Sequence, residues 1–441
     1  MTLSKWSIVG LALSVAAMLI PSLSALAADR PYLEAALEAA RWIESSALRT
    51  DHGVVWPADP RDPETVDTSL YAGTPGVVLF FLEAYRSTGD ADYLKTACAG
   101  ADSLLAALPS VRGTGLYEGA AGIGFVLEET YKASKIPKYR EGVLQCIKAI
   151  QNQAVRAGKG IQWSDTTDII SGNAGTGLFL LYAAREMKDA SFRAQAVQAG
   201  QHLIEVGRPE AGGLKWAMDP KFPRLMPNFS HGTAGIAYFL ATLYAETKDR
   251  QFLDAALAGA KYLQAVANTE GDSCLIFHNE PDGKNLYYLG YCHGPVGTAR
   301  LWYQLYQTTG NAVWLDWLKK SARGILESGI PEKETPGFWN NVGVCCGSAG
   351  VAEFFLDVYR VTKDSRYIEF CRRVTDNLLS RGTHEGEGMK WIQAEHRVRP
   401  DFLVAQTGLM QGAAGIGMWL LRLDSFDQGK EVALRLPDSP F

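Results

Sequence analysis

Apolar and polar positions divide the chain into two alternating kinds of segment. One kind is apolar around its whole circumference, as in residues 77–85, 236–244 and 351–359, which is typical of a buried helix. The other kind carries charge on one face and apolar side chains on the other, as surface helices do. These amphipathic segments are residues 31–49, 90–107, 137–158, 190–206, 249–268, 311–328 and 364–381. The pattern predicts inner and outer helices in alternation.

A G-x-x-G turn precedes each apolar segment, and it occurs seven times. The first glycines are Gly73, Gly119, Gly172, Gly232, Gly294, Gly347 and Gly412. Their spacing varies too much for a solenoid of fixed period but suits helical hairpins with variable loops. Seven buried and seven amphipathic helices satisfy every apolar face as an inner ring wrapped by an outer ring. The predicted fold is therefore all-α, an α/α toroid, in which the last inner segment, 412–421, closes against the first pair. The seven turns are expected at one face, the mouth of the ring.

The first 27 residues have the pattern of a secretory signal peptide. Lys5 is followed by an apolar run to Ile20 and by small residues ending at Ala27, which predicts cleavage after Ala27 and a secreted or periplasmic protein. The alternative is an uncleaved anchor, but the apolar core has about 13 residues and a spanning helix needs ~20. We expect one toroid domain over residues 28–424, with 425–441 as a peripheral C-terminal tail.

Composition agrees with a folded protein and excludes one class of partner. The chain is 47% hydrophobic and 21% charged, with a net charge of −5. No basic run is present, so the sequence does not indicate nucleic-acid binding. After signal cleavage no segment is expected to span a membrane, and the sequence does not specify an oligomeric state.

Seven cysteines are an odd number for an exported chain. Cys98, Cys146 and Cys371 fall in outer-helix segments and are expected to be core thiols. Cys274 lies in a loop, where it is either a lone thiol or a disulfide partner.

The other three cysteines form a candidate metal site. Cys292 and Cys345 each lie two residues before the first glycine of a turn, and Cys346 follows directly. Helix N-termini favour thiolates, and three thiolates with one open position suit Zn²⁺. The alternative is a disulfide, either between Cys345 and Cys346 or between Cys292 and Cys345.

The seven turns, with C-H-G in the fifth and C-C-G in the sixth, resemble the lanthionine synthetase C-like family over about residues 31–424. The resemblance implies a toroid with zinc in its mouth. It also implies that zinc activates a substrate thiol, of a peptide or of a small molecule such as glutathione, for addition to a dehydroamino acid, which forms a thioether. Cys292 and Cys345 match the family's ligands. Cys346 stands where the family usually has histidine, although all-cysteine sets occur in some branches.

Two further residues match functional positions of the family. His231, directly before the fourth turn, matches the residue that protonates the enolate; a capping or core histidine is the alternative. Asp168 matches an aspartate of the third repeat that would orient a histidine or the substrate, and a plain N-cap is the alternative. His293, beside Cys292, is expected to support the site rather than to be a fourth ligand.

The sequence departs from the family at Tyr288 and Tyr291, where the synthetases commonly have arginine and tryptophan. Without that arginine, the sequence does not show which group would stabilise the developing enolate. The signal peptide also separates this chain from a cytoplasmic precursor peptide, so a different electrophile is possible.

Two other classes of function compete with the thiol-addition enzyme. A glycan-active toroid enzyme would need a pair of carboxylates at fixed separation. The acidic and aromatic residues available to it are Glu280, Asp282, Glu385, Glu387, Trp339 and Trp391. In a non-catalytic peptide-binding module, zinc would only tie the fifth and sixth repeats together.

Overall fold

The computed structural model describes residues 1–2, 30–219, 225–430 and 434–441. The predicted signal peptide lies outside the described residues, apart from its first two. Within the described part of the chain, no helix has the length and apolar character that a membrane crossing requires.

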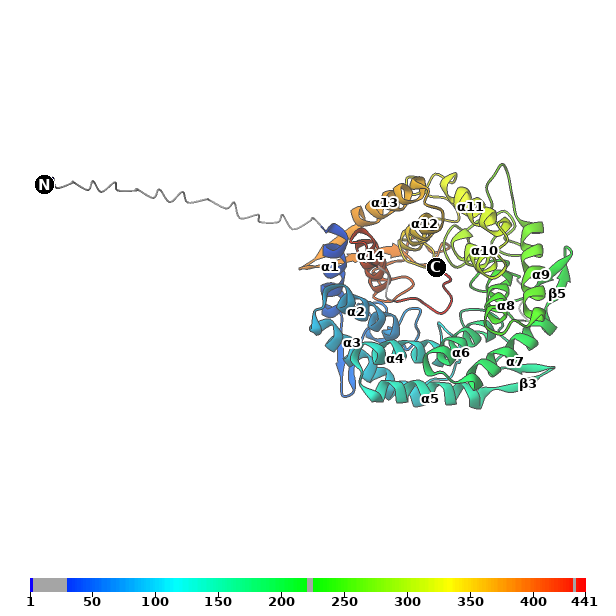
Figure 1. The fold of residues 1–441 in the computed structure, drawn as a ribbon, viewed down its shortest axis with the longest axis horizontal. Coiled ribbons are helices and arrows are strands. Elements are labelled where there is room, and N and C mark those ends of the chain that lie inside the picture. The colour runs from blue at the N-terminus through cyan, green and yellow to red at the C-terminus, as the bar shows by residue number, and fades with distance from the viewer. Residues whose placement is uncertain (3–29, 220–224, 431–433) are drawn as a thin grey trace.

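The predicted inner ring is confirmed. Each inner helix begins directly after the first glycine of a G-x-x-G turn, and Figure 1 shows these helices around a common centre. They are α2 (Thr74–Thr88), α4 (Ala120–Ser134), α6 (Asn173–Met187), α8 (Thr233–Thr247), α10 (Pro295–Thr309), α12 (Ser348–Thr362) and α14 (Ala413–Asp427).

The amphipathic segments form the outer ring, as predicted. They are α1 (Pro31–Ser45), α3 (Ala91–Ala107), α5 (Pro137–Gln153), α7 (Ala190–Val206), α9 (Arg250–Val266), α11 (Val313–Leu326) and α13 (Ser365–Ser380). The turn from an inner to an outer helix is short. In α6–α7, for example, Lys188 ends the inner helix in the left-handed conformation and Asp189 caps the outer helix. A left-handed residue and an aspartate cap are two of the usual helix-ending and helix-starting devices.

Short antiparallel hairpins, which the hydrophobic pattern did not predict, extend the loops that follow several outer helices. The pairs are β1 (Leu48–Thr50) with β2 (Gly53–Val55), β3 (Val155–Ala157) with β4 (Gly160–Gln162), β5 (Arg208–Glu210) with β6 (Gly213–Lys215), β7 (Gly382–Glu385) with β8 (Gly388–Trp391), and β9 (Gln393–Ala394) with β10 (Leu403–Val404). Two 3₁₀ turns, η1 (Pro63–Thr65) and η2 (Leu108–Ser110), complete the elements of the described residues.

The first and last helices close the ring. Outer helix α1 packs on inner helix α14 (Figure 1). The guanidinium of Arg30 donates to the buried carboxylate of Asp424 at 2.9 Å. The closure predicted from the order of the segments is therefore confirmed.

The second glycine of the turn is required because the chain folds back on itself there. A Cβ at Gly297 would lie 2.1 Å from the carbonyl oxygen of Tyr291, and one at Gly350 would lie 2.0 Å from that of Val344. Both distances are far below van der Waals contact, so no larger residue fits without moving the loop.

A closed cycle of backbone hydrogen bonds joins the seven turns at the mouth. Each turn donates an N–H to a carbonyl of the next turn, with N···O distances of 2.9 to 3.2 Å. The bonds run from Tyr71 to Tyr117, Tyr117 to Ile170, Ile169 to Ser230, Ser230 to Cys292, Cys292 to Cys345, Cys345 to Met410 and Met410 back to Tyr71. Every acceptor residue lies two residues before the first glycine of its turn, and this place is called position −2 below. Cys292 and Cys345 therefore occupy the position that links each turn to its neighbours.

The C-terminal tail is not peripheral, so that expectation was wrong. Helix α14 continues to Asp427, and the last residues then run into the ring (Figure 1). Asp438 is fully buried there and forms an ion pair with Arg300 of α10 at 2.9 Å. The carboxylate of Asp438 is tolerated inside the ring because a buried charge of opposite sign, the guanidinium of Arg300, pairs with it.

Candidate metal centre

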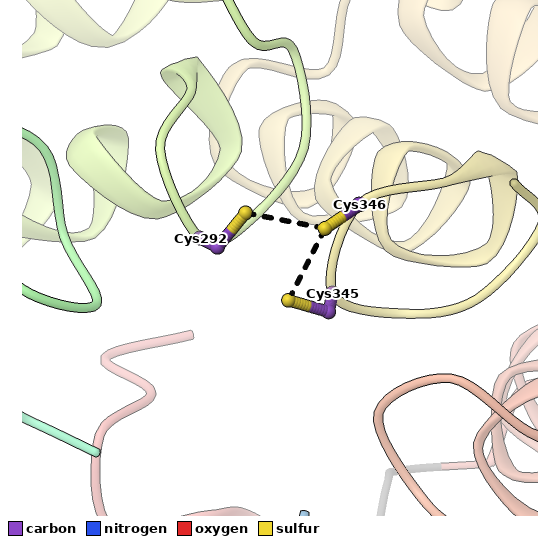
Figure 2. A group of neighbouring side chains, drawn as sticks. All are labelled: Cys292, Cys345 and Cys346. Atoms are coloured by element: carbon purple, nitrogen blue, oxygen red, sulfur yellow. Dashed lines mark hydrogen bonds between the residues drawn. The ribbon is translucent and has the colours of Figure 1, made fainter. Parts of the chain in front are cut away.

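The structure brings the three predicted ligands together. Cys292 precedes α10, Cys345 and Cys346 precede α12, and Figure 2 shows their sulfur atoms turned toward one another. The Sγ atom of Cys346 lies 3.3 Å from that of Cys292 and 3.4 Å from that of Cys345. All three thiols are buried, and their sulfurs lie within 4.8 Å of one another.

This donor set fits a zinc ion. Zn–S bonds of ~2.3 Å at tetrahedral angles would separate two sulfurs by about 3.8 Å, close to the distances found. Hydrogen bonds from Cys292 and Cys346 lower the pKa of Cys345 well below its usual value, whereas hydrogen bonds with Cys345 and Cys346 raise the pKa of Cys292 well above its own. Without a cation, the buried cluster therefore favours one thiolate, because like charges at this distance repel. A divalent cation would allow all three thiols to ionise.

Two residues missed by the sequence analysis complete the surroundings of the cluster. The amide nitrogen of Gln411 lies 3.8 Å from the sulfur of Cys346, and the same amide donates to the hydroxyl of Tyr71 at 3.0 Å. Tyr71 occupies position −2 of the first turn, and Gln411 directly precedes the first glycine of the seventh. The signal was therefore present, because these are the positions of Cys345 and Cys346 in the sixth turn.

His231 and Asp168 form the predicted pair. The Nδ1 atom of His231 lies 2.5 Å from Oδ2 of Asp168. The other carboxylate oxygen accepts the backbone N–H groups of Ser171 and Gly172 at 2.9 Å each. Asp168 therefore both organises the turn before α6 and orients the histidine. The side chain of His231 is 28% exposed and that of Asp168 is 1% exposed, so only the histidine can reach a substrate.

The aspartate controls the protonation of His231. Burial of the ring lowers the pKa of His231, but the hydrogen bond and charge of Asp168 outweigh burial and raise it above its ordinary value. The charge of Cys345 raises the same pKa further.

His293 lies beside the cluster but not in it. Among the described residues, the group whose donor atoms lie within 4.8 Å of one another contains only the three cysteines. The ring of His293 is 5.5 Å from that of His231 and 4.4 Å from that of His278, between centroids. Burial, followed by the charges of the other two histidines, lowers the pKa of His293 well below its usual value. His293 therefore contributes a neutral imidazole to the mouth.

Tyr288 stands where the family pattern has arginine, and another arginine approaches it. Burial raises the pKa of Tyr288 to about 12, while a hydrogen bond with Arg397 opposes that shift. Negative charge on Cys292 and Cys346 would raise the pKa of this hydroxyl as well. The loop before β10 therefore brings the guanidinium of Arg397 near Tyr288.

Four of the six residues named for a glycan site are engaged in local contacts. Trp339 and Trp391 are buried, and each indole N–H donates to a backbone carbonyl. Glu280 accepts from Tyr262, and Glu385 pairs with Lys390 on the β7–β8 hairpin. The two glutamates belong to separate segments, Glu280 to the loop before α10 and Glu385 to strand β7.

The remaining cysteines lie away from the centre. Cys98, Cys146 and Cys371 belong to the outer helices α3, α5 and α13, as predicted. Burial raises the pKa of Cys146 and of Cys274 to about 12, which makes these thiols poor nucleophiles and poor ligands.

Comparisons with known proteins were made for sequence and for structure. The sequence model described as lanthionine synthetase C-like protein matches residues 64–433. A zebrafish (Danio rerio) protein, glutathione S-transferase LANCL1, is 22% identical over 338 residues, which cover 74% of this chain and 77% of that protein.

Two solved structures share the architecture. Nisin cyclase superposes with a TM-score of 0.61 at 16% identity, covering 89% of this chain and 92% of its own. The GH76A α-1,6-mannanase of Salegentibacter sp. HEL1_6 superposes with a TM-score of 0.50 at 14% identity, covering 89% and 99%. At such identities both similarities establish the toroid fold and nothing about the chemistry.

Proposed function

Because the chain belongs to the lanthionine synthetase C-like family, we propose that it is a zinc-dependent enzyme that adds a thiol to a dehydroamino acid or a similar electrophile. The observation that carries this proposal is the buried cluster of Cys292, Cys345 and Cys346 at the mouth, with the His231–Asp168 pair beside it. A glutathione S-transferase among the similar proteins agrees with thiol chemistry.

Cys292, Cys345 and Cys346 would hold the ion. When bound, zinc supplies a Lewis acid that lowers the pKa of a substrate thiol and keeps it as a nucleophile at neutral pH. Three thiolate ligands donate more negative charge to the metal than two thiolates and an imidazole. The substrate sulfur is therefore expected to be more nucleophilic here than at a site with a histidine ligand.

His231 would supply the proton that completes the addition. The substrate thiol releases its proton to solvent, and its sulfur bonds to the β-carbon of the electrophile while the π electrons move to leave an enolate. The enolate takes a proton at the α-carbon from His231, and solvent reprotonates the histidine. Asp168 holds the ring through Nδ1, so that Nε2 is the nitrogen available for this transfer.

The test combines metal analysis with a thiol-addition assay. We expect one zinc per chain of purified protein, and thioether formation from glutathione and a dehydroalanine-containing peptide, detected by mass spectrometry. Cys345→Ala is expected to lose the metal and the activity. Cys346→His is expected to keep the metal but react more slowly, because the site loses a thiolate donor.

A matched control is Cys98→Ala, which removes a half-buried thiol of an outer helix and should change neither quantity. Zinc without turnover on either a peptide or a glutathione substrate would instead indicate a peptide-binding module. A protein without zinc, or a Cys345→Ala variant that still holds one equivalent, would contradict the proposed centre.

A further inference from the structure

Directly beneath the mouth lies a layer of side chains contributed by all seven turns. Its members occupy position −3, three residues before the first glycine of each turn, and so precede the position that carries Cys292 and Cys345. They are Leu70, Leu116, Ile169, Phe229, Tyr291, Val344 and Leu409. Six are hydrocarbon side chains, and Tyr291 alone has a polar atom. Because Tyr291 is buried, its hydroxyl needs a hydrogen-bond partner below the layer.

The C-terminal tail provides that partner. Oδ2 of Asp438 accepts the hydroxyl of Tyr291 at 2.7 Å and that of Tyr117 at 3.1 Å. It also accepts from the guanidinium of Arg300 at 2.9 Å. The same guanidinium lies 4.6 Å from the centroid of the Tyr291 ring. One carboxylate oxygen therefore fixes the residue next to Cys292 from below.

The tail beyond Asp438 is anchored to the same helix, α10. The ring of Phe441 stacks on Tyr303 at 4.6 Å with an interplanar angle of 6°. The amide of Gln307 donates to the carbonyl of Pro440 at 3.3 Å. Both contacts lie C-terminal to the attachment of Asp438 at Arg300, so the end of the tail is held along α10.

A cavity lies on the other side of this layer. It has a volume of about 560 Å³ and is lined by Tyr117, Tyr291, Val344 and Leu409, together with residues of α12, α14 and the tail. Only the thickness of one turn thus separates the cysteine cluster from the cavity. If the Tyr291 hydroxyl lost Asp438, its alternative partner would be water in the cavity, and turning toward it would move the chain that carries Cys292.

We propose that Asp438 is a positioning residue for the metal centre, which holds Tyr291 and through it sets the direction of the Cys292 sulfur. This inference rests on the proposed function only in assuming that the cluster binds a metal. It concerns the geometry of a ligand and does not depend on which electrophile is used. Residues that orient metal ligands from outside the coordination sphere typically contribute about 10- to 100-fold to metal affinity.

The test is a double-mutant cycle between Asp438 and Tyr291 in the full-length protein, loaded with Co²⁺ as a coloured substitute for Zn²⁺. Asp438→Ala and Tyr291→Phe are each expected to shift the sulfur-to-cobalt absorption bands and to weaken Co²⁺ binding roughly 10- to 100-fold. In the Tyr291→Phe background, Asp438→Ala should add little, because the hydroxyl through which it acts is already gone. Ser439→Ala, a neighbouring change in the tail, is the matched control and should leave the bands unchanged.

Asp438→Asn is the second variant, to be used if Asp438→Ala does not fold. It keeps the volume of the side chain and removes the charge opposite Arg300, and it should give a smaller shift of the same kind. Loss of thermal stability with unchanged cobalt bands and affinity would overturn the inference, since it would make the tail a purely structural element. Equal effects of Asp438→Ala in both backgrounds would overturn it as well.

The test of Asp438 can still be interpreted if the proposed function is wrong. Wild-type protein that binds Co²⁺ but adds no thiol would refute the enzyme and leave the positioning result standing. If wild-type protein takes up no metal, alkylation of Cys292 by iodoacetamide in the metal-free protein replaces the cobalt signal. Asp438→Ala should then raise the alkylation rate of Cys292 relative to Cys146 in the same molecule, and an unchanged ratio would refute the role of Asp438.

Discussion

At the scale of single residues, the hydrogen bond between His231 and Asp168 determines how a proton is held at the mouth. The carboxylate is buried and the imidazole is partly exposed, so the charge that stabilises the imidazolium is shielded from water. The proton is therefore bound more tightly in the folded protein than in the unfolded chain. The stabilisation it provides is complete below a pH of about 6.5, the ordinary pKa of histidine, and is lost as the pH rises through the raised pKa.

Asp168→Asn tests this pair. Asparagine keeps an oxygen for the N–H groups of Ser171 and Gly172, but its NH₂ faces Nδ1 of His231 and disfavours the imidazolium. The pKa of His231 should fall, so the alkaline limb of the pH–rate profile should move to lower pH. The rate at neutral pH should fall by about 100-fold, the usual contribution of a general acid.

Zinc content measured beside the pH–rate profile serves as the control for Asp168→Asn and should not change. A profile identical to that of the wild type, in a variant with full zinc, would show that His231 does not donate the proton.

At the scale of elements, the fifth and sixth turns approach each other too closely for any side chain between them. A Cβ at Gly290 would lie 2.7 Å from the carbonyl oxygen of Cys345 and 2.7 Å from the Cα atom of Cys346. Both neighbours are backbone atoms, so the strain could be relieved only by moving one turn away from the other. The hydrogen bond from Cys292 to Cys345, at 3.2 Å, crosses the same gap.

Gly290→Ala is therefore expected to release the metal by separating Cys292 from the other two thiols, although it touches no ligand side chain. Metal per chain after gel filtration measures this effect. The control is Gly310→Ala at the end of α10, where φ is +69° and nothing lies within 4 Å of the added Cβ. That change should destabilise the protein by about 1 kcal/mol and leave the metal content unchanged. Full zinc in Gly290→Ala would contradict the predicted separation.

The repeating elements were predictable because each one carries its own signal. The apolar period, the glycine turn and the charged outer face recur in all seven copies, and the structure confirms the helices that they predict. The cysteines could be assigned to one site from the sequence because Cys292 and Cys345 occupy equivalent positions in neighbouring turns. Tyr71 and Gln411 were missed, since their side chains are not metal ligands and only ring closure brings the first turn near the sixth.

The tail could not be predicted in the same way. It has no repeat and no apolar period, and its meaning depends on contacts with residues far away in the sequence. Asp438 bonds to Arg300, 138 positions away, and to Tyr117, 321 positions away. An aspartate near the end of a chain looks solvent-exposed until the ring that surrounds it is known.

At the scale of the whole molecule, the packing of α1 on α14 turns a row of hairpins into a ring. Ala36 and Ala39 of α1 are fully buried. Small side chains allow the two helices to approach closely, and the ion pair of Arg30 with Asp424 closes the same edge.

Ala39→Glu places an unpaired carboxylate on the buried face of α1 and is expected to destabilise the folded ring by about 3 to 5 kcal/mol. Denaturant unfolding followed by circular dichroism measures the change. Glu34→Lys on the exposed face of α1 is the control and should alter stability by less than about 0.5 kcal/mol. Wild-type stability in Ala39→Glu would mean that α1 is not needed to close the ring.

Ring closure also fixes when the protein can mature. Arg30 and Asp424 are 394 positions apart, so the whole stretch between them must be synthesised before these two partners can meet. Contacts so distant along the chain form slowly, because the loop between the partners must first close. Asp438 lies 147 positions after Tyr291, so the hydrogen bond between them also forms late in the order of synthesis. The cysteine cluster should thus acquire its final shape only once residue 438 has been made.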